Sequence, residues 1–373
     1  MDHFALLPAA ERATVFREAA ARLRVGSATI IEKDFWVCWT LQKIFSNAAL
    51  PGPLFKGGTS LSKVYKVIER FSEDVDIVLD RHTLGFVGEQ DPSNIAGTNK
   101  RNRKLDELVG KCSETVQGTV RNELQNSFRS VLGEADWKIS EDPADADRQS
   151  LLFAYPLGLE ADLYGLGSYI RPVVRLEFGC RGDVWPSDRQ SIQPYVADML
   201  PGLMAQPVAE VHVLRPERTF WEKATLLHAV FHSGKMPPRL SRHHYDLARL
   251  YRHEFGELAM KDFGLLASVV EHKKVFFREA AARYDLAKPG SLRVCPPESH
   301  VAQIRSDYRD MREMFFAEPP PFDTVMSDLT ESTVEHTERE GFQARPDRGK
   351  PVKTLCVGAA GVSFGRKADS PTC

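Results

Sequence analysis

Several features that would assign a chain to a specialised class of protein are absent from this sequence. The six cysteines lie far apart and never in a CxxC pair, so we expect free thiols and neither a disulfide framework nor a zinc site. No run of about 18 apolar residues occurs, so no membrane span is expected. The formal net charge is only −2, so overall charge gives no sign of nucleic-acid binding.

The N-terminus also lacks the pattern of a signal peptide. Acidic and basic residues alternate there with apolar ones, and no apolar core with a small-residue cleavage site follows. We therefore expect a cytoplasmic protein. With 373 residues, of which 42% are hydrophobic and 27% charged, the composition is that of a soluble globular protein of two or three domains.

Apolar periodicity predicts the first elements of the chain. Helical spacing over residues 9–24 and 30–48 predicts two N-terminal helices. A break rich in proline and glycine follows, with room only for a very short strand. The next helix is expected over residues 60–70, with Thr59 or Ser60 as its N-cap.

Two later segments alternate apolar and polar residues in the manner of strands with one buried face. In DVDIVLD, residues 74–80, the alternation places Asp74 and Asp76 together on the other face. In PVVRLEFG, residues 172–179, it places Glu177 on the polar face. The sequence therefore predicts two strands that each expose acidic side chains.

The remaining chain has mainly helical character. Residues 93–150 are polar and mostly helical in pattern, and a helical period returns from about residue 206. We predict an α+β fold with a small mixed sheet flanked by helices in residues 1–205, a helical domain in residues 206–337 and a flexible tail in residues 338–373.

A glycine pair and an aspartate pair lie one helix apart. In KGGTS, residues 56–60, the glycines permit a tight turn, and the helix after them offers free N–H donors to a phosphate. Asp74 and Asp76 would present oxygen ligands to Mg²⁺, or to Mn²⁺. Glu177 is the best candidate for a third ligand, because pairing of its strand with the aspartate strand would bring it near.

Each signal alone also has a structural interpretation. A glycine pair before a helix can be a simple turn, and aspartates on a strand can face water at a sheet edge. Because both occur in this order with one helix between them, they favour a phosphate-binding site with a divalent cation.

The stretch KGGTSLSKVYKVIERFSEDVDIVL resembles the signature of the AbiEii-type nucleotidyltransferase toxins, a branch of the DNA polymerase β-like nucleotidyltransferase superfamily that includes the MenT toxins of mycobacteria. Three further segments follow the order of that family: EKDFW (residues 32–36), RPERTFWEKATLLH (215–228) and SRHHYDLARL (241–250). The resemblance covers roughly residues 25–335. It implies a polymerase β-like core followed by a mainly helical part.

The resemblance also implies roles for individual residues. Asp74 and Asp76 would be the metal ligands, and Lys223 and Asp246 would be further residues needed for activity. The nucleotide-binding positions that it implies are Lys56, Gly57, Gly58, Thr59, Ser60, Ser72 and Arg242.

Structural roles for the two later segments stay open. Lys223 could pair with Glu222 or Glu217 on a solvated helix face. Asp246 could form a salt bridge with Arg242, one helical turn away, that serves the fold as well as the site.

Other residues near these segments are expected to have no catalytic role. His243 and His244 are adjacent on a helix and point in different directions, so we predict surface or RNA-facing groups and no zinc site. In EKDFW, we expect Phe35 and Trp36 to pack the N-terminal helices onto the sheet, with the charged residues 32–34 solvated or paired.

By resemblance, the function is metal-dependent transfer of NMP from an NTP to an RNA acceptor, which the family implies to be the 3′ end of tRNA. Growth arrest would follow, and a cognate antitoxin would be the partner. Two other classes remain open: a phosphotransferase or regulator that binds GTP or ATP and acts on protein, and a non-catalytic interaction module. Basic residues at 100–104 and 239–244 are candidate RNA-binding patches.

Overall fold

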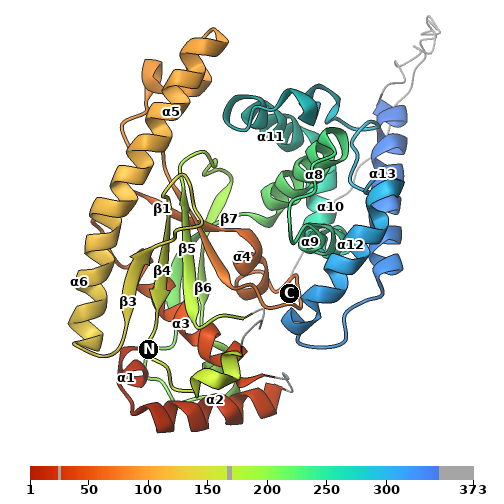
Figure 1. Ribbon diagram of the computed structural model, residues 1–373. Helices are drawn as coiled ribbons and strands as arrows, with labels where there is room; N and C mark the ends of the chain where they lie inside the picture. The colour runs from red at the N-terminus through yellow and green to blue at the C-terminus, as the bar shows by residue number, and fades with distance from the viewer. Residues whose placement is uncertain (24–26, 166–169, 344–373) are drawn as a thin grey trace, which may run out of the picture.

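The computed structural model describes residues 1–23, 27–165 and 170–343, with side chains up to residue 332. A seven-stranded sheet in the order β3-β4-β5-β2-β1-β7-β6 forms its centre, and helices lie on both sides (Figure 1). The strands are β1 (Pro53–Lys56), β2 (Asp74–Leu79), β3 (Lys138–Glu141), β4 (Ser150–Ala154), β5 (Val173–Gly179), β6 (Ser187–Ile192) and β7 (Ala209–Leu214).

Strand β2 occupies the middle of this sheet. It runs antiparallel to β1 and parallel to β5, while β1 is also parallel to β7, so the sheet is mixed. The buried side chains of β2 alternate as predicted, with Val75, Ile77 and Leu79 in the main core. The α+β prediction is confirmed.

The N-terminal helices pack on one face of the sheet. Trp36 and Trp39 each lie 5.9 Å, between ring centroids, from Phe153 of β4, which confirms the predicted packing of EKDFW. A π-helical turn, Val116–Val120, joins α5 to α6 along the same core. The helices before β7 are α1 (Asp2–Ala5), α2 (Ala9–Leu23), α3 (Ala28–Phe45), α4 (Gly57–Lys63), α5 (Thr98–Thr115), α6 (Arg121–Leu132) and α7 (Tyr195–Met199).

The helices after β7 pack around a second apolar cluster. They lie across from α5, beyond the other side of the sheet (Figure 1). These helices are α8 (Pro216–Ser233), α9 (Ser241–Tyr251), α10 (Glu254–Lys261), α11 (Phe263–Phe276), α12 (Glu298–Asp310) and α13 (Phe322–Gln343). Within the described residues, no helix is both long and apolar enough to cross a membrane.

Several sequence-based expectations about the elements differ from the structure. Residues 209–214 form strand β7, not helix, because their side chains alternate between buried and exposed up to Val213. Residues 93–150 are mostly helical as expected, with α5 and α6, but their end contributes β3 and the first residue of β4. Helix α13 extends to Gln343, so residues 338–343 are not tail, and the rest of the predicted tail lies outside the described residues.

The helix predicted over residues 60–70 also differs. Helix α4 begins at Gly57, has Lys56 and not Thr59 or Ser60 as its N-cap, and ends at Lys63. Lys66 then adopts a left-handed conformation with φ of 53°. The chain beyond it is extended and donates the Phe71 N–H to the Met314 carbonyl at 2.6 Å. Long-range pairing thus replaces the last turns that the local period had predicted.

Candidate active site

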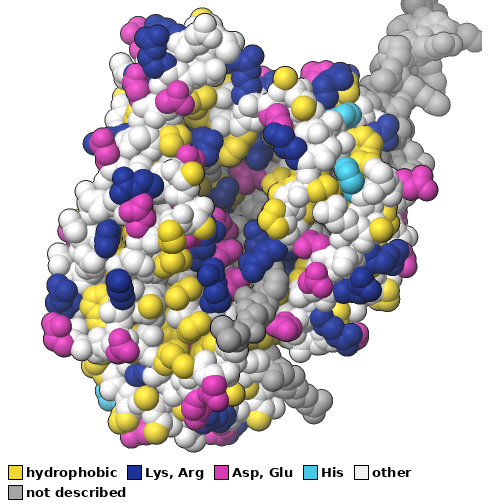
Figure 2. Space-filling view, in the orientation of Figure 1, with side chains coloured by type: hydrophobic (Ala, Val, Ile, Leu, Met, Phe, Trp, Pro, Cys, Tyr) yellow, Lys and Arg dark blue, Asp and Glu magenta, His cyan; other side chains and the backbone are white. Residues whose placement is uncertain are grey.

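A cavity of about 270 Å³ lies where the polar face of the central strands meets α8, α9 and α11. Figure 2 shows the surface hollowed between the part that carries α5 and the part that carries the C-terminal helices, with basic and acidic side chains inside the hollow. The predicted site residues that line the cavity are Lys56, Gly57, Gly58, Ser72, Asp74, Asp76, Glu177, Lys223 and Arg242.

The register of three strands explains the wall formed by the sheet. Asp76 of β2 lies opposite Lys56 of β1 on one side and opposite Glu177 of β5 on the other. Directly paired residues present their side chains on the same face of a sheet. The prediction that strand pairing brings Glu177 beside the aspartates is therefore confirmed.

Charges of both signs surround Asp76. Burial and the neighbouring negative charge of Asp74 raise the pKa of Asp76, against the lowering effect of Lys56, Arg242 and Lys223. The Arg242 guanidinium lies 3.6 Å from the Asp74 carboxylate. Two carboxylates that repel each other inside a cavity form a site that gains from a bound cation.

Glycine is required at positions 57 and 58 because the start of α4 lies very close to the aspartate strand and the segment before it. Gly57 has φ of +81°, and a Cβ there would lie 1.9 Å from an oxygen of Asp76. A Cβ at Gly58 would lie 2.7 Å from Ser72 Oγ and 2.9 Å from Arg70 Nη2. The two glycines therefore allow the start of α4 to lie directly against the aspartate strand.

Thr59 and Ser60 do not line the cavity. Both are buried, and the Thr59 hydroxyl donates to the carbonyls of Ser72 and Asp74. The Ser60 hydroxyl donates to the Gly57 carbonyl at 2.9 Å. Thr59 holds the turn against β2 and Ser60 bonds within the turn, so the structure does not support side-chain contact between either residue and a nucleotide.

The wall formed by the helices is built on a buried ion-pair network. Asp246 is fully buried and accepts two bonds from the Arg70 guanidinium, at 2.8 and 2.7 Å, and lies 2.9 Å from Lys223 Nζ. Burial alone would raise the pKa of Asp246, but Arg70 and Lys223 outweigh it and hold that pKa below its usual value. Lys223 lines the cavity, whereas Asp246 lies behind it.

This network corrects the structural interpretations considered for the two later segments. Lys223 pairs with Asp246, not with Glu222 or Glu217, and Arg242 lies against Asp74. Burial and the surrounding positive charges lower the pKa of Lys223 despite its partner.

The two histidines are not surface groups. His244 is buried, and His243 lines the cavity with Nδ1 3.4 Å from Lys223 Nζ. Burial and the charges of Lys223 and Arg242 hold the pKa of His243 well below its usual value, so it is neutral near pH 7. Of the candidate basic patch at 239–244, Arg239 forms an ion pair with Glu73 at 3.1 Å.

Glu177 lies beside the aspartates and lines the same cavity. Its carboxylate forms an ion pair with Arg175 of the same strand. Within residues 1–23, 27–165 and 170–332, whose side chains the structure describes, no group of three or more His, Cys, Asp or Glu is placed to hold a metal ion. Asp74 and Asp76 remain the candidate metal ligands, and the role of Glu177 as a third ligand stays a prediction.

Three charged lining residues were missed by sequence reasoning. Arg70 was assigned to a helix, and Glu222 was considered only as a partner of Lys223, although it pairs with Lys56 at 3.2 Å. Lys273 of α11 carries no local motif. Burial together with the positive charges of Lys56 and Arg218 lowers the pKa of Lys273 to about 8.

The charged residues of EKDFW are buried and paired. Lys33 lies 2.7 Å from Glu73, the residue before Asp74, and Asp34 lies 2.8 Å from Lys63 at the end of α4. Helix α3 thereby holds both segments that form the strand wall. The motif positions the site without lining it.

Comparison with known proteins identifies the family of this chain. The family model described as nucleotidyl transferase AbiEii toxin, type IV toxin–antitoxin system, matches residues 41–328, well over half of the chain. No curated protein matches the chain. Among solved structures, MenT4, a nucleotidyltransferase toxin from Mycobacterium tuberculosis H37Rv, is similar at 17% identity and a TM-score of 0.48, with 90% of this chain and 94% of that chain covered. The chain belongs to the AbiEii family of nucleotidyltransferase toxins.

Proposed function

We propose that the cavity binds an NTP with a divalent cation, in the first instance Mg²⁺, and transfers NMP to an RNA acceptor, the 3′ end of tRNA. The family implies an NTP substrate and a divalent metal. The observation that carries the proposal is that Asp74, Asp76, Lys223 and the Gly57–Gly58 turn line one cavity.

The strand wall suits the divalent cation, and the helix wall suits the phosphates of the NTP. A cation bound by Asp74 and Asp76 would neutralise phosphate charge and polarise the α-phosphate. Lys223, held by Asp246, would contact the phosphates from the helix side, and Arg242 would add a second positive charge. Gly57 and Gly58 also line the cavity, where the main chain of their turn would contact the phosphates.

The proposed reaction is an in-line displacement. An acceptor hydroxyl oxygen bonds to the α-phosphorus, the bond to the β-phosphate oxygen breaks, and pyrophosphate leaves. The hydroxyl proton is released to water. In this reaction the protein contributes mainly charge neutralisation and positioning, which the buried network provides by fixing Lys223.

Labelled nucleotides test the reaction class. Purified full-length protein is incubated with total RNA and each α-labelled NTP in turn, with Mg²⁺ or Mn²⁺. We expect label in RNA, lost in Asp76→Asn and on chelation of the metal. Label on protein from a γ-labelled NTP, with none in RNA, would contradict nucleotidyl transfer and favour a phosphotransferase.

The proposed biological role is growth arrest by blocked translation, released by an antitoxin that the type IV toxin–antitoxin family implies. Expression of the wild-type chain should arrest growth, and Asp74→Asn or Asp76→Asn should relieve the arrest at equal protein level. If both variants still arrested growth, the toxicity would not depend on the proposed reaction in the cavity.

A further inference from the structure

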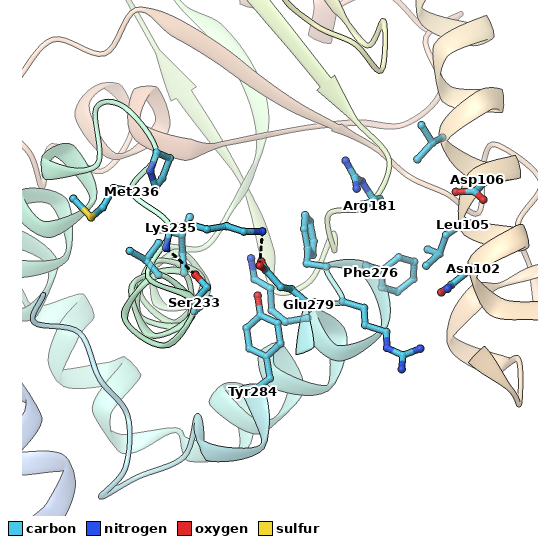
Figure 3. Close-up of a pocket in the computed structure, with 18 residues that line it drawn as sticks. Asn102, Leu105, Asp106, Arg181, Ser233, Lys235, Met236, Phe276, Glu279 and Tyr284 are labelled. Atoms are coloured by element: carbon cyan, nitrogen blue, oxygen red, sulfur yellow. Dashed lines mark hydrogen bonds and ion pairs between the residues drawn. The ribbon is translucent and has the colours of Figure 1, made fainter. Parts of the chain in front are cut away.

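A second, larger cavity of about 1050 Å³ lies between α5, α8 and the end of α11. Figure 3 shows Asn102, Leu105 and Asp106 of α5 on one side, and Lys235 and Tyr284 on the other. Its volume is at the upper end of the range of small-molecule pockets, about 300–1,000 Å³. It therefore suits a ligand longer than one nucleotide.

The larger cavity adjoins the candidate active site. Leu226, Lys273 and Phe277 line both cavities. A ligand in the larger cavity that contacts Phe277 would therefore lie next to the proposed reaction centre.

Two cations lie near the ring of Phe277, where the two cavities adjoin. Its ring is half-buried, with Lys273 Nζ 4.4 Å and the Arg181 guanidinium 5.6 Å from the ring centroid. An aromatic face accompanied by cations is the combination that binds single-stranded nucleic acid, by base stacking and phosphate attraction.

The charge of the lining also favours an anionic ligand. Arg181, Lys235, Lys273 and Arg278 face only two acids, Asp106 and Glu279, across the cavity. Glu279 is itself paired with Lys235 at 2.5 Å, as the dashed line in Figure 3 marks. Arg278 is exposed at the cavity edge, where a phosphate backbone would pass.

We propose that the larger cavity is the acceptor site, in which the unpaired 3′ end of an RNA strand lies with its terminal base stacked on Phe277 and its backbone beside Arg181 and Arg278. This inference rests on the proposed transfer to RNA and adds the location of the acceptor. It also assigns Phe277 as the residue that positions the terminal nucleotide.

RNA binding without NTP tests the location directly. The anisotropy of a fluorescent single-stranded oligoribonucleotide is titrated with full-length wild type, Phe277→Leu, Phe277→Tyr and Arg278→Glu. Loss of stacking costs about 1–3 kcal/mol, so Phe277→Leu should weaken binding by about 5- to 150-fold, while Phe277→Tyr, which keeps the ring, should bind within a few-fold of wild type. Arg278→Glu should also weaken binding and reduce its salt dependence.

Two controls keep the result specific. Arg312→Glu removes an exposed arginine that pairs with Glu318 and does not line this cavity, so it should bind RNA as wild type does. Arg278 lines the larger cavity but not the candidate active site, so Arg278→Glu should bind a fluorescent NTP analogue with unchanged affinity.

The outcomes separate this inference from the proposed function. RNA affinity equal to wild type in both Phe277→Leu and Arg278→Glu would overturn the acceptor site, even if RNA is labelled. Equal loss in Phe277→Leu and Phe277→Tyr would overturn stacking on Phe277. Failure of the wild type to label RNA would contradict the proposed function, whereas the binding comparison would still decide whether this cavity holds RNA.

Discussion

The two walls of the reaction cavity differ in charge and in construction. The strand wall carries Asp74, Asp76 and Glu177 on neighbouring strands, whereas the helix wall carries Lys223 and Arg242. The two aspartates are close in sequence, and strand register places Glu177 beside them. The basic residues come from α8 and α9 and are positioned by ion pairs, above all by the buried Asp246.

The two walls also differ in what their buried carboxylates do: one serves ligand binding and the other stabilises the fold. Burial and the negative charge of Asp74 raise the pKa of Asp76. The ionised Asp76 carboxylate therefore destabilises the folded state, and a bound cation would offset that effect. Asp246 lies between two cations with a lowered pKa, so its carboxylate stabilises the fold. Substitution of Asp76 should therefore lower activity more than stability, and substitution of Asp246 should lower stability strongly.

The largest effect on activity is expected from Asp76→Asn. Removing one preorganised electrostatic group typically costs about 10²–10³-fold in rate, so NMP transfer should fall by at least that factor. The free energy of unfolding should stay equal or rise, because a buried repulsion is removed. Labelling rates and urea unfolding measure the two quantities. Asp80→Asn, just beyond the end of β2, is the matched control, and a large loss of stability in Asp76→Asn would contradict this view of the wall.

The largest effect on stability is expected from Asp246→Asn. Breaking a buried ion pair costs about 3–5 kcal/mol, and here Arg70 and Lys223 would both lose the carboxylate that they share. Asp328→Asn, which breaks a more exposed pair with Arg252, should cost about 1 kcal/mol or less.

The pH dependence of unfolding gives that comparison a second readout. Since the pKa of Asp246 is lowered in the folded state, its stabilisation is present above about pH 4 and is lost as pH falls toward the folded-state value. Wild type should lose stability in acid more steeply than Asp246→Asn. Parallel acid profiles would contradict the ion-pair role.

A smaller effect is expected at Lys273, which faces Glu222, Lys56 and Arg218. With a pKa of about 8, its ammonium loses its charge as pH rises through that value, so affinity for an NTP analogue should fall by about tenfold. Lys273→Arg should keep its affinity through about pH 9, and Lys273→Met should be weak at every pH. A wild-type pH profile retained in Lys273→Met would assign the titration to another group.

The smallest effect is expected from Glu177→Gln. Because Glu177 pairs with Arg175, its loss should change transfer by no more than about threefold. A loss as large as that of Asp76→Asn would assign Glu177 as the third metal ligand and contradict a site of two carboxylates.

The strand wall was largely predictable from the sequence because its signals are local. The alternation of residues 74–80 places both aspartates on one face, and the strand over residues 172–179 obeys the same rule. What the pattern missed was the reason for the glycines: Gly57 is fixed by its contact with Asp76, which no local period reveals.

The helix wall was less predictable because long-range contacts build it. Lys223 and Asp246 came from the family resemblance, and inspection alone left them as ordinary helix-face residues. Arg70 was hidden by a helical period that pairing with residues 314–316 overrides. Lys273 belongs to a helix with no motif, so only the fold brings it to the cavity.

The most direct test of the two-wall account is the binding of Mn²⁺ and a non-hydrolysable NTP analogue, followed by electron paramagnetic resonance and equilibrium dialysis. Wild type should bind both together. We expect Asp76→Asn to lose the bound Mn²⁺, and Lys223→Met to keep Mn²⁺ while binding the analogue more weakly. Wild-type binding of Mn²⁺ and analogue by both variants would contradict the account.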